Sequence, residues 1–293
     1  MATRKTTPAS SKRAAAKPAA KPAALWKTLS DSSAGLKSRV AALTSLGWGV
    51  AESKQSLRRA LDIMTNADEP VALRLATLAA IQSATFGANQ FAALRPEYLK
   101  GLRRAAEDVD PEMRQRALGM LAREHDPRAQ ELLMQGLKDP DKALLPPEKA
   151  LQLLSYDVHA GAFDMARKMV DSPPSDMARR EALRLLAADA GSAPVFEKIL
   201  ADRRENIEAR RLSASALQHI APDRLHARAR SIAMSEDEDD EIKAICLTAL
   251  ANFAEPAEGD AALLTRARGL EQEKSPTASL GHAARQYVAK RGG

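Results

Sequence analysis

The sequence predicts an all-α protein in which helical hairpins stack into an α-solenoid. Aromatic residues make up only 3% of the 293 residues, which favours helices packed through small side chains over sheets packed through large ones. Apolar residues recur with helical spacing behind recognisable helix-start signals. The segments that carry this spacing also recur at a nearly constant interval. Such a repeat predicts units that bury their apolar faces by stacking on one another.

The clearest helix start is the tripeptide Asp-Pro-Glu at 110–112. A carboxylate at Asp110 can accept hydrogen bonds from free amides at the helix start, and Pro111 suits the first helical position, so a helix is predicted to begin there. Apolar residues follow at i, i+4, i+7 and i+8 on one face: Met113, Ala117, Met120 and Leu121. The same stripe recurs in ARREALRLL (178–186), ARRLSASAL (209–217) and IKAICLTAL (242–250), and more loosely in LRLATLAAI (73–81) and PPEKALQLL (146–154).

A small or compact residue stands at the centre of each copy. These residues are Thr77, Ala117, Ala150, Ala182, Ser213 and Cys246, at intervals of 40, 33, 32, 31 and 33. Between the copies lie second helical patterns, at 128–139, 160–171, 193–204 and 260–271, each joined to the next copy by a short turn. One unit is therefore helix A, a turn and helix B. The central small residues are expected to let adjacent helices approach closely.

This pattern resembles the HEAT repeats, an armadillo-like family, over roughly residues 54 to 291. It is strongest between residues 111 and 254, while the unit that begins near Ser275 fits poorly. The resemblance implies a right-handed α-solenoid of about six to seven hairpin repeats, with the B helices lining the concave face. It implies no single activity, because such repeats serve in scaffolds, adaptors, transport factors and a few enzymes.

The chain divides into three predicted parts: residues 1–23, 24–53 and 54–291. The first is a basic tail, expected to be disordered, whose cations are Arg4, Lys5, Lys12, Arg13, Lys17 and Lys21. The net charge is +6 and the tail holds six cations and no acid, so the other 270 residues are formally neutral. The tail resembles those of linker-histone-like proteins. Residues 24–53 are expected to form cap helices that Trp26 and Trp48 anchor, with a functional attachment site as the alternative.

Basic residues recur on the B helices and are the candidate partner-binding residues. They are Arg74, Arg114, Arg179, Arg210 and Lys243. In the first interpretation they form a line along the concave face that binds phosphates or an acidic segment of a partner. In the alternative, each cation pairs with a carboxylate in the same or an adjacent turn, and the candidates are Asp110, Asp176, Glu208 and Asp240. Pro146 and Pro147 interrupt the line in one repeat.

Other groups with possible chemistry give weaker signals. The acid run EDEDDE at 236–241 lacks the spacing and glycine of a calcium loop, and is expected to be a solvated helix N-terminus. The histidines lack paired metal-ligand spacing, although His219 and His226 flank one turn. No His-Glu dipeptide occurs, which argues against the iron-dependent hydroxylases built on HEAT repeats. Cys246 is expected to be an inert packed thiol, and no metal or cofactor is predicted.

Two functions follow as hypotheses. The first is a non-catalytic scaffold or adaptor that holds another protein on the concave face. The second is a nucleic-acid-associated protein that makes non-specific contact through its tail; its enzymatic form, less favoured, resembles the HEAT-like alkylpurine DNA glycosylases. No apolar run is long enough to cross a membrane. A cytoplasmic location is expected, with association with the nucleoid as the alternative.

Overall fold

The computed structural model describes residues 21–87, 91–157, 160–253, 261–272 and 277–291. These residues form α-helices joined by turns and short 3-10 helices, and they contain no strand. The prediction of an all-α fold of HEAT-like helical hairpins is confirmed. The chain forms two compact units, Met1–Met113 and Arg114–Gly293, each of which is a stack of hairpins.

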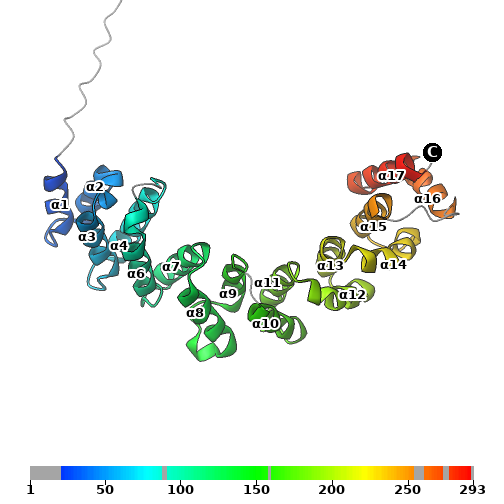
Figure 1. Ribbon diagram of the computed structural model, residues 1–293, viewed down its shortest axis with the longest axis horizontal. Coiled ribbons are helices and arrows are strands. Elements are labelled where there is room, and N and C mark those ends of the chain that lie inside the picture. Colours follow the sequence, from blue (N-terminus) through cyan, green and yellow to red (C-terminus); the bar gives the residue numbers. More distant parts are fainter. Residues whose placement is uncertain (1–20, 88–90, 158–159, 254–260, 273–276, 292–293) are drawn as a thin grey trace, which may run out of the picture. The chain divides into compact units, whose positions relative to one another are not determined.

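Unit 1 contains two hairpins and part of a third. The hairpins pair α1 (Pro22–Ser30) with α2 (Leu36–Leu46), and α3 (Lys54–Thr65) with α4 (Val71–Ala84) (Figure 1). The 3-10 helices η1 (Gly47–Ala51) and η2 (Ala92–Leu94) precede α3 and α6 (Arg95–Ala105). Helix α6 packs on α3, and α4 packs on α2, so the A and B helices form separate layers.

Unit 2 repeats the same plan. Helix α7 (Pro111–Arg123) spans the boundary between the units, and the helices that follow are α8 (Pro127–Lys138), α9 (Pro147–Leu154), α10 (Ala160–Asp171), α11 (Asp176–Leu186), α12 (Ala193–Ala201), α13 (Ile207–Ile220), α14 (Pro222–Met234), α15 (Asp240–Phe253), α16 (Ala261–Gln272) and α17 (Ala278–Arg291). Two 3-10 helices, η3 (Pro140–Lys142) and η4 (Ala190–Ser192), lie in the turns. Consecutive helices from α8 onward pair as hairpins, and α9, α11, α13, α15 and α17 contact one another in series as the B layer.

Local sequence signals set where the helices begin. The Asp110 carboxylate accepts the Met113 amide at 2.9 Å, and α7 begins at Pro111 as predicted. Side chains at Ser53, Asp126 and Ser175 likewise accept amides of the first helical turns. These caps fix the register of each apolar stripe.

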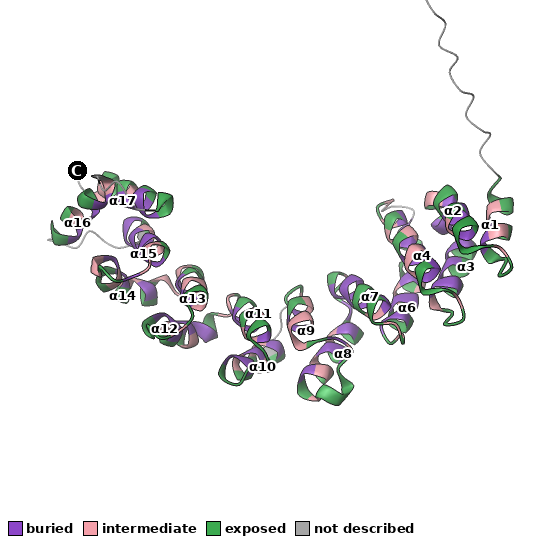
Figure 2. Cartoon of the chain, turned by 180° about the vertical axis from the view of Figure 1, so that it is seen from behind, coloured by how far each residue is buried: buried purple, intermediate pink, exposed green. Residues whose placement is uncertain are grey.

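The central small residues of the B helices lie in the core. All six that were predicted from the repeat are buried, and five of them expose none of their surface. In Figure 2 the buried faces of paired helices meet, while the exposed faces point outward. Small side chains at these positions let neighbouring helices pack closely. The poorly matching unit near Ser275 does form a hairpin, because α16 packs on α17.

The N-terminal region differs from the expectation in two details. Helix α1 begins at Pro22, before the predicted start of the cap helices, while residues 1–20 of the predicted tail lie outside the described residues. Trp26 is buried beneath the guanidinium of Arg59, 5.9 Å from the ring centroid, as an anchor should be. Trp48 is 67% exposed. Its interpretation as a buried anchor is therefore wrong.

Candidate binding groove on helices α11, α13 and α15

Three of the recurring cations of the B helices, Arg74, Arg179 and Arg210, bind a carboxylate of the neighbouring repeat. Arg74 and Arg210 are buried, and Arg179 is partly buried. Arg210 donates from Nη1 and Nη2 to both oxygens of Glu238, at 2.9 and 2.7 Å, and from Nε to the carbonyl of Leu200 at 3.1 Å. The Arg210 guanidinium thus joins the end of α12, the A helix of the same hairpin, to the turn between α14 and α15 in the next hairpin.

The same arrangement occurs in other repeats. Arg179 donates to both oxygens of Glu205, at 2.9 and 3.1 Å, and to the carbonyl of Val170 at 3.2 Å. In unit 1, Arg74 pairs with Asp108 and donates to the carbonyl of Met64. We call this arrangement the arginine staple. Planar guanidinium and carboxylate groups suit such two-point contacts.

Arg39 forms another staple that the sequence reasoning missed. It donates to both oxygens of Glu69 at 2.7 Å and to the carbonyl of Leu29 at 2.9 Å. The signal was present, because Arg39 stands three residues before Ala42, the same offset that separates each predicted B-helix cation from its small residue. Helices α1 and α2 therefore form a repeat of the same kind as those that follow.

Two of the predicted cations depart from the staple geometry. Arg114 donates from Nε to the carbonyl of Leu144, 30 residues later, at 3.2 Å. Lys243 pairs within its own first turn, with Asp240 at 2.9 Å. In the following hairpin Gly281 occupies the equivalent place, three residues before Ala284.

The staples differ from the local ion pairs offered as the alternative: Arg74, Arg179 and Arg210 pair with carboxylates of the next repeat. The Lys243 pair joins residues of one helical turn, while the staples of Arg39, Arg74, Arg179 and Arg210 join residues 26 to 34 positions apart. The acid run at 236–241 is also less solvated than expected: Glu238 is buried in a staple, and Asp239 accepts the amides of Glu241 and Ile242. The run does stand at the start of α15, as expected, but it is not solvated throughout, because Glu238 and Asp239 bind arginines of the preceding repeat.

A groove of about 610 Å³ crosses three consecutive B helices of unit 2. Residues of α11, α13 and α15 line it, with an apolar part at Leu183, Leu212 and Ile245. Arg180, Arg184 and Arg211 line it as well, and so do Asp176, Glu208, Glu241, Asn206 and Ser215. Arg179 is the only staple cation that reaches this groove.

Charges are distributed unevenly along the groove. Arg211 binds both oxygens of Asp239, at 2.9 and 2.6 Å, and approaches Glu208 and Glu241 at 3.3 and 3.5 Å. These contacts raise the pKa of Arg211 and, with the helix-start amides, hold the pKa of Asp239 below its usual range. Arg180 is exposed, and the described part of the chain offers it neither a hydrogen bond nor an ion pair. The groove therefore contains one cation on α13, Arg211, that is paired with carboxylates, and one on α11, Arg180, that has no ion pair in the described structure.

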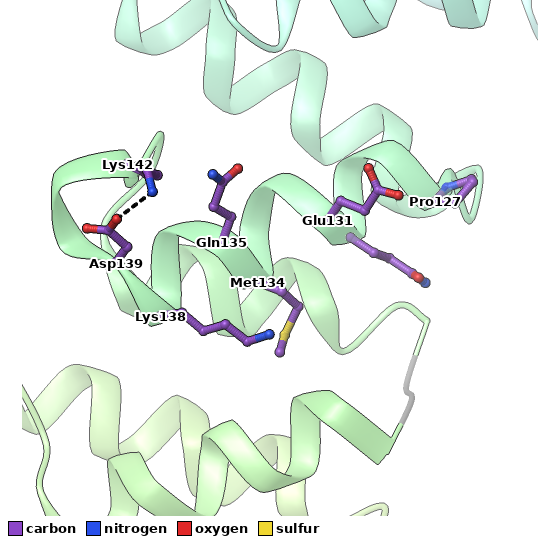
Figure 3. Close-up of a pocket in the computed structure, with 8 residues that line it drawn as sticks. Pro127, Glu131, Met134, Gln135, Lys138, Asp139 and Lys142 are labelled. Atoms are coloured by element: carbon purple, nitrogen blue, oxygen red, sulfur yellow. Dashed lines mark ion pairs between the residues drawn. The ribbon is translucent and has the colours of Figure 1, made fainter.

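Other features offer less converging chemistry. A depression of about 620 Å³ lies on α8, but its lining comes from that helix and the turn after it (Figure 3). No group of three or more His, Cys, Asp or Glu side chains is placed to hold a metal among the described residues. His226 approaches the carbonyl of Ala249 at 3.0 Å. Burial raises the pKa of the Cys246 thiol to about 12, as suits a packed side chain.

The stacked hairpins and staples define a HEAT-like helical-repeat protein. No protein-family model and no curated protein matches the sequence. Among solved structures, the complex of CpcE and CpcF of phycocyanin lyase from Nostoc sp. PCC7120 is similar, with a TM-score of 0.40 and 18% identity over 96% of this chain and 99% of that one. Human deoxyhypusine hydroxylase in complex with glycerol is also similar, with a TM-score of 0.36 and 12% identity over 84% of this chain and 99% of that one.

These comparisons correct one prediction from the sequence. Both similar structures are named as enzymes, which contradicts the expectation that this chain is not an enzyme. At such low identity and TM-score the likeness assigns neither activity to this chain. The resemblance of the tail to linker-histone-like tails gains no support from them. No helix in the described parts of the chain is long and apolar enough to cross a membrane.

Proposed function

We propose that the chain binds a segment of another protein in the groove formed by α11, α13 and α15. The observation that supports this most directly is the origin of the groove: successive repeats supply its side chains from similar places on three parallel B helices. A surface that repeats in this way suits an extended chain, which also repeats at short intervals. The groove mixes apolar residues with charged ones, and its arginines are of the kind enriched in protein interfaces.

Site-specific crosslinking tests the proposal. A photo-crosslinking amino acid replaces Ser215, which is exposed and lines the groove, or Lys198 on α12, which is exposed outside it. We expect a partner from the source cells to crosslink from position 215 and not from position 198. Equal crosslinking from both positions, or crosslinking from position 198 alone, would remove the groove as the binding surface.

A second candidate function is contact with nucleic acid, supported by one face of α6. Two adjoining depressions of about 580 and 350 Å³ share Arg103 and are also lined by Lys100, Arg104 and Arg95. The six tail cations precede this unit in the sequence, all but Lys21 lying outside the described residues. The cations on α6, beside which Glu107 and Asp108 also line the larger depression, are of the kind that neutralises phosphates, and so are those of the tail sequence.

The salt dependence of DNA retention tests this second function. If the six tail cations each displace a counterion, the log–log salt slope should be about −5, and deletion of residues 1–20 should remove most of it. If the α6 face contributes, Lys100→Glu with Arg104→Glu should flatten the slope further without a change in the helical circular dichroism signal. Full-length protein that ignores duplex DNA at low salt would exclude this function.

A further inference from the structure

We infer that the segment bound in the groove carries a carboxylate close to an apolar side chain. This inference rests on the proposed function and specifies the chemistry of the partner. Arg180 and Arg184 stand one helical turn apart on α11, where side chains at i and i+4 project from the same face. Arg180 has no partner in the described structure, and Arg184 pairs only with Glu181 on its own helix. Two neighbouring guanidiniums can therefore converge on one incoming carboxylate.

The acids that line the groove do not offer an equivalent site for a basic segment. Glu208 and Glu241 both lie within 3.5 Å of Arg211, which reduces the negative charge available to a ligand. Asp176 is the exception. It is exposed and lies four residues before Arg180, one helical turn away, so it is close enough in sequence to compete with an incoming carboxylate, although the two form no ion pair in the described structure.

The apolar part of the groove indicates where the apolar side chain of the bound segment should lie. Leu183 is buried beside the two arginines, and Leu212 and Ile245 on the next two helices are half-buried. Packed helices lie about 8–10 Å apart and an extended chain advances about 3.3 Å per residue, so one helix corresponds to about three residues. In an extended chain of the polyproline II type, with three residues per turn and about 3.1 Å per residue, side chains three residues apart share one face. A carboxylate at α11 would then place an apolar side chain about three residues away over Leu212.

Selection from a random peptide library tests this chemistry with a defined probe. Peptides of about twelve residues displayed on phage are depleted on the bare support and then selected on the full chain; the Arg180→Glu, Arg184→Glu variant is used only afterwards, to test the peptides that were selected. We expect enriched peptides to carry Asp or Glu about three residues from a large apolar residue. Arg228→Gln on α14 is the matched control, because it removes an exposed arginine that does not line the groove.

Individual selected peptides are then measured by fluorescence anisotropy. Arg180→Gln and Arg184→Gln should each weaken binding by about threefold to tenfold, because each removes a charge-assisted contact. Arg228→Gln should have no effect, and Asp176→Asn should strengthen binding because it removes the competing carboxylate. All four positions are exposed, and unchanged thermal unfolding should show that the fold is intact.

The outcomes distinguish a failure of the inferred segment chemistry from a failure of the proposed binding groove. Peptides that bind the groove but are basic or purely apolar, and that bind more weakly to Asp176→Asn, would overturn the inference and leave the proposed function standing. If no selected peptide is sensitive to substitutions in the groove, the proposed function itself fails.

Discussion

Removing the carboxylate of the most buried staple should cost far more stability than removing one that is half-exposed. The side chains of Arg210 and Glu238 are 8% and 4% exposed, whereas those of Arg179 and Glu205 are both 23% exposed. Glu238→Ala leaves the guanidinium buried without its counter-charge, a change that typically costs about 3–5 kcal/mol. Glu205→Ala leaves a guanidinium that water can reach, and should cost about 1 kcal/mol.

A double replacement separates the two causes of this loss. Arg210→Met with Glu238→Leu removes both charges, so most of the loss should be recovered, since a buried pair replaced by apolar residues is often close to neutral. Urea unfolding followed by circular dichroism gives the free energies. Hydrogen exchange in α13 and α15 shows whether the loss is local, as expected when each repeat touches mainly its neighbours.

Two results would refute this reasoning. If Glu238→Ala and Glu205→Ala were equally destabilising, burial would not decide the cost. If the double replacement were as destabilising as Glu238→Ala alone, the loss would come from packing and not from an unpaired charge.

Three further predictions concern packing and titration. Gly136→Ala should destabilise the protein by about 1–3 kcal/mol in urea unfolding, because the new Cβ would lie 2.8 Å from the Ala143 Cα. Gly119→Ala is the control, since its Cβ meets only an ordinary contact at 3.8 Å. This second variant should stabilise its helix by up to about 1 kcal/mol. Burial raises the pKa of the Cys246 thiol to about 12, against an ordinary value of 9.0. Its contribution to the free energy of unfolding should therefore be complete below pH 9 and decline above it. Cys246→Ala should abolish that decline in unfolding measured from pH 8 to 11. The lowered pKa of Asp239 gives the opposite pH dependence of stability. Its contribution to the free energy of unfolding should be complete above the unfolded-state pKa near 3.8, and it should be lost as the pH falls through the folded-state pKa. Asp239→Asn should therefore flatten the dependence of stability on pH in acid.

The sequence was sufficient for the helices because local chemistry determines them. The pattern at 160–171 coincides with helix α10, and the Asp110 cap places the start of α7. Both depend on contacts within a few residues, which are visible in the sequence. The first hairpin was harder to recognise from the sequence. The repeat had been identified by the apolar stripe of its B helices, whereas the clearest sign of the first hairpin is Arg39, three residues before Ala42.

The partners of the charged residues were beyond local reasoning. Glu238 looked like one acid of a solvated run, yet it is buried because Arg210 reaches it from the preceding repeat. That contact depends on how far one hairpin is displaced on the next, which no short stretch of sequence encodes. Trp48 shows the same difficulty in reverse, since residue type alone predicts burial and the structure leaves it exposed.

In ARREALRLL and ARRLSASAL, one position of offset separates an arginine that forms a staple from an arginine that lines the groove. Successive residues of a helix differ by about 100° in direction. Arg179 and Arg210 therefore bind the turn of the next hairpin as staples, while Arg180 and Arg211 line the groove, which Arg179 borders as well and from which Arg211 also binds Asp239 of the next hairpin. A staple needs its carboxylate at one fixed place, because an unpaired buried charge is costly. The groove position carries no such requirement: Arg211 has three acids around it and Arg180 has none in the described structure. The second position of the pair therefore tolerates both a paired arginine at Arg211 and an unpaired one at Arg180, and under the proposed function it is Arg180 that would set what the groove binds.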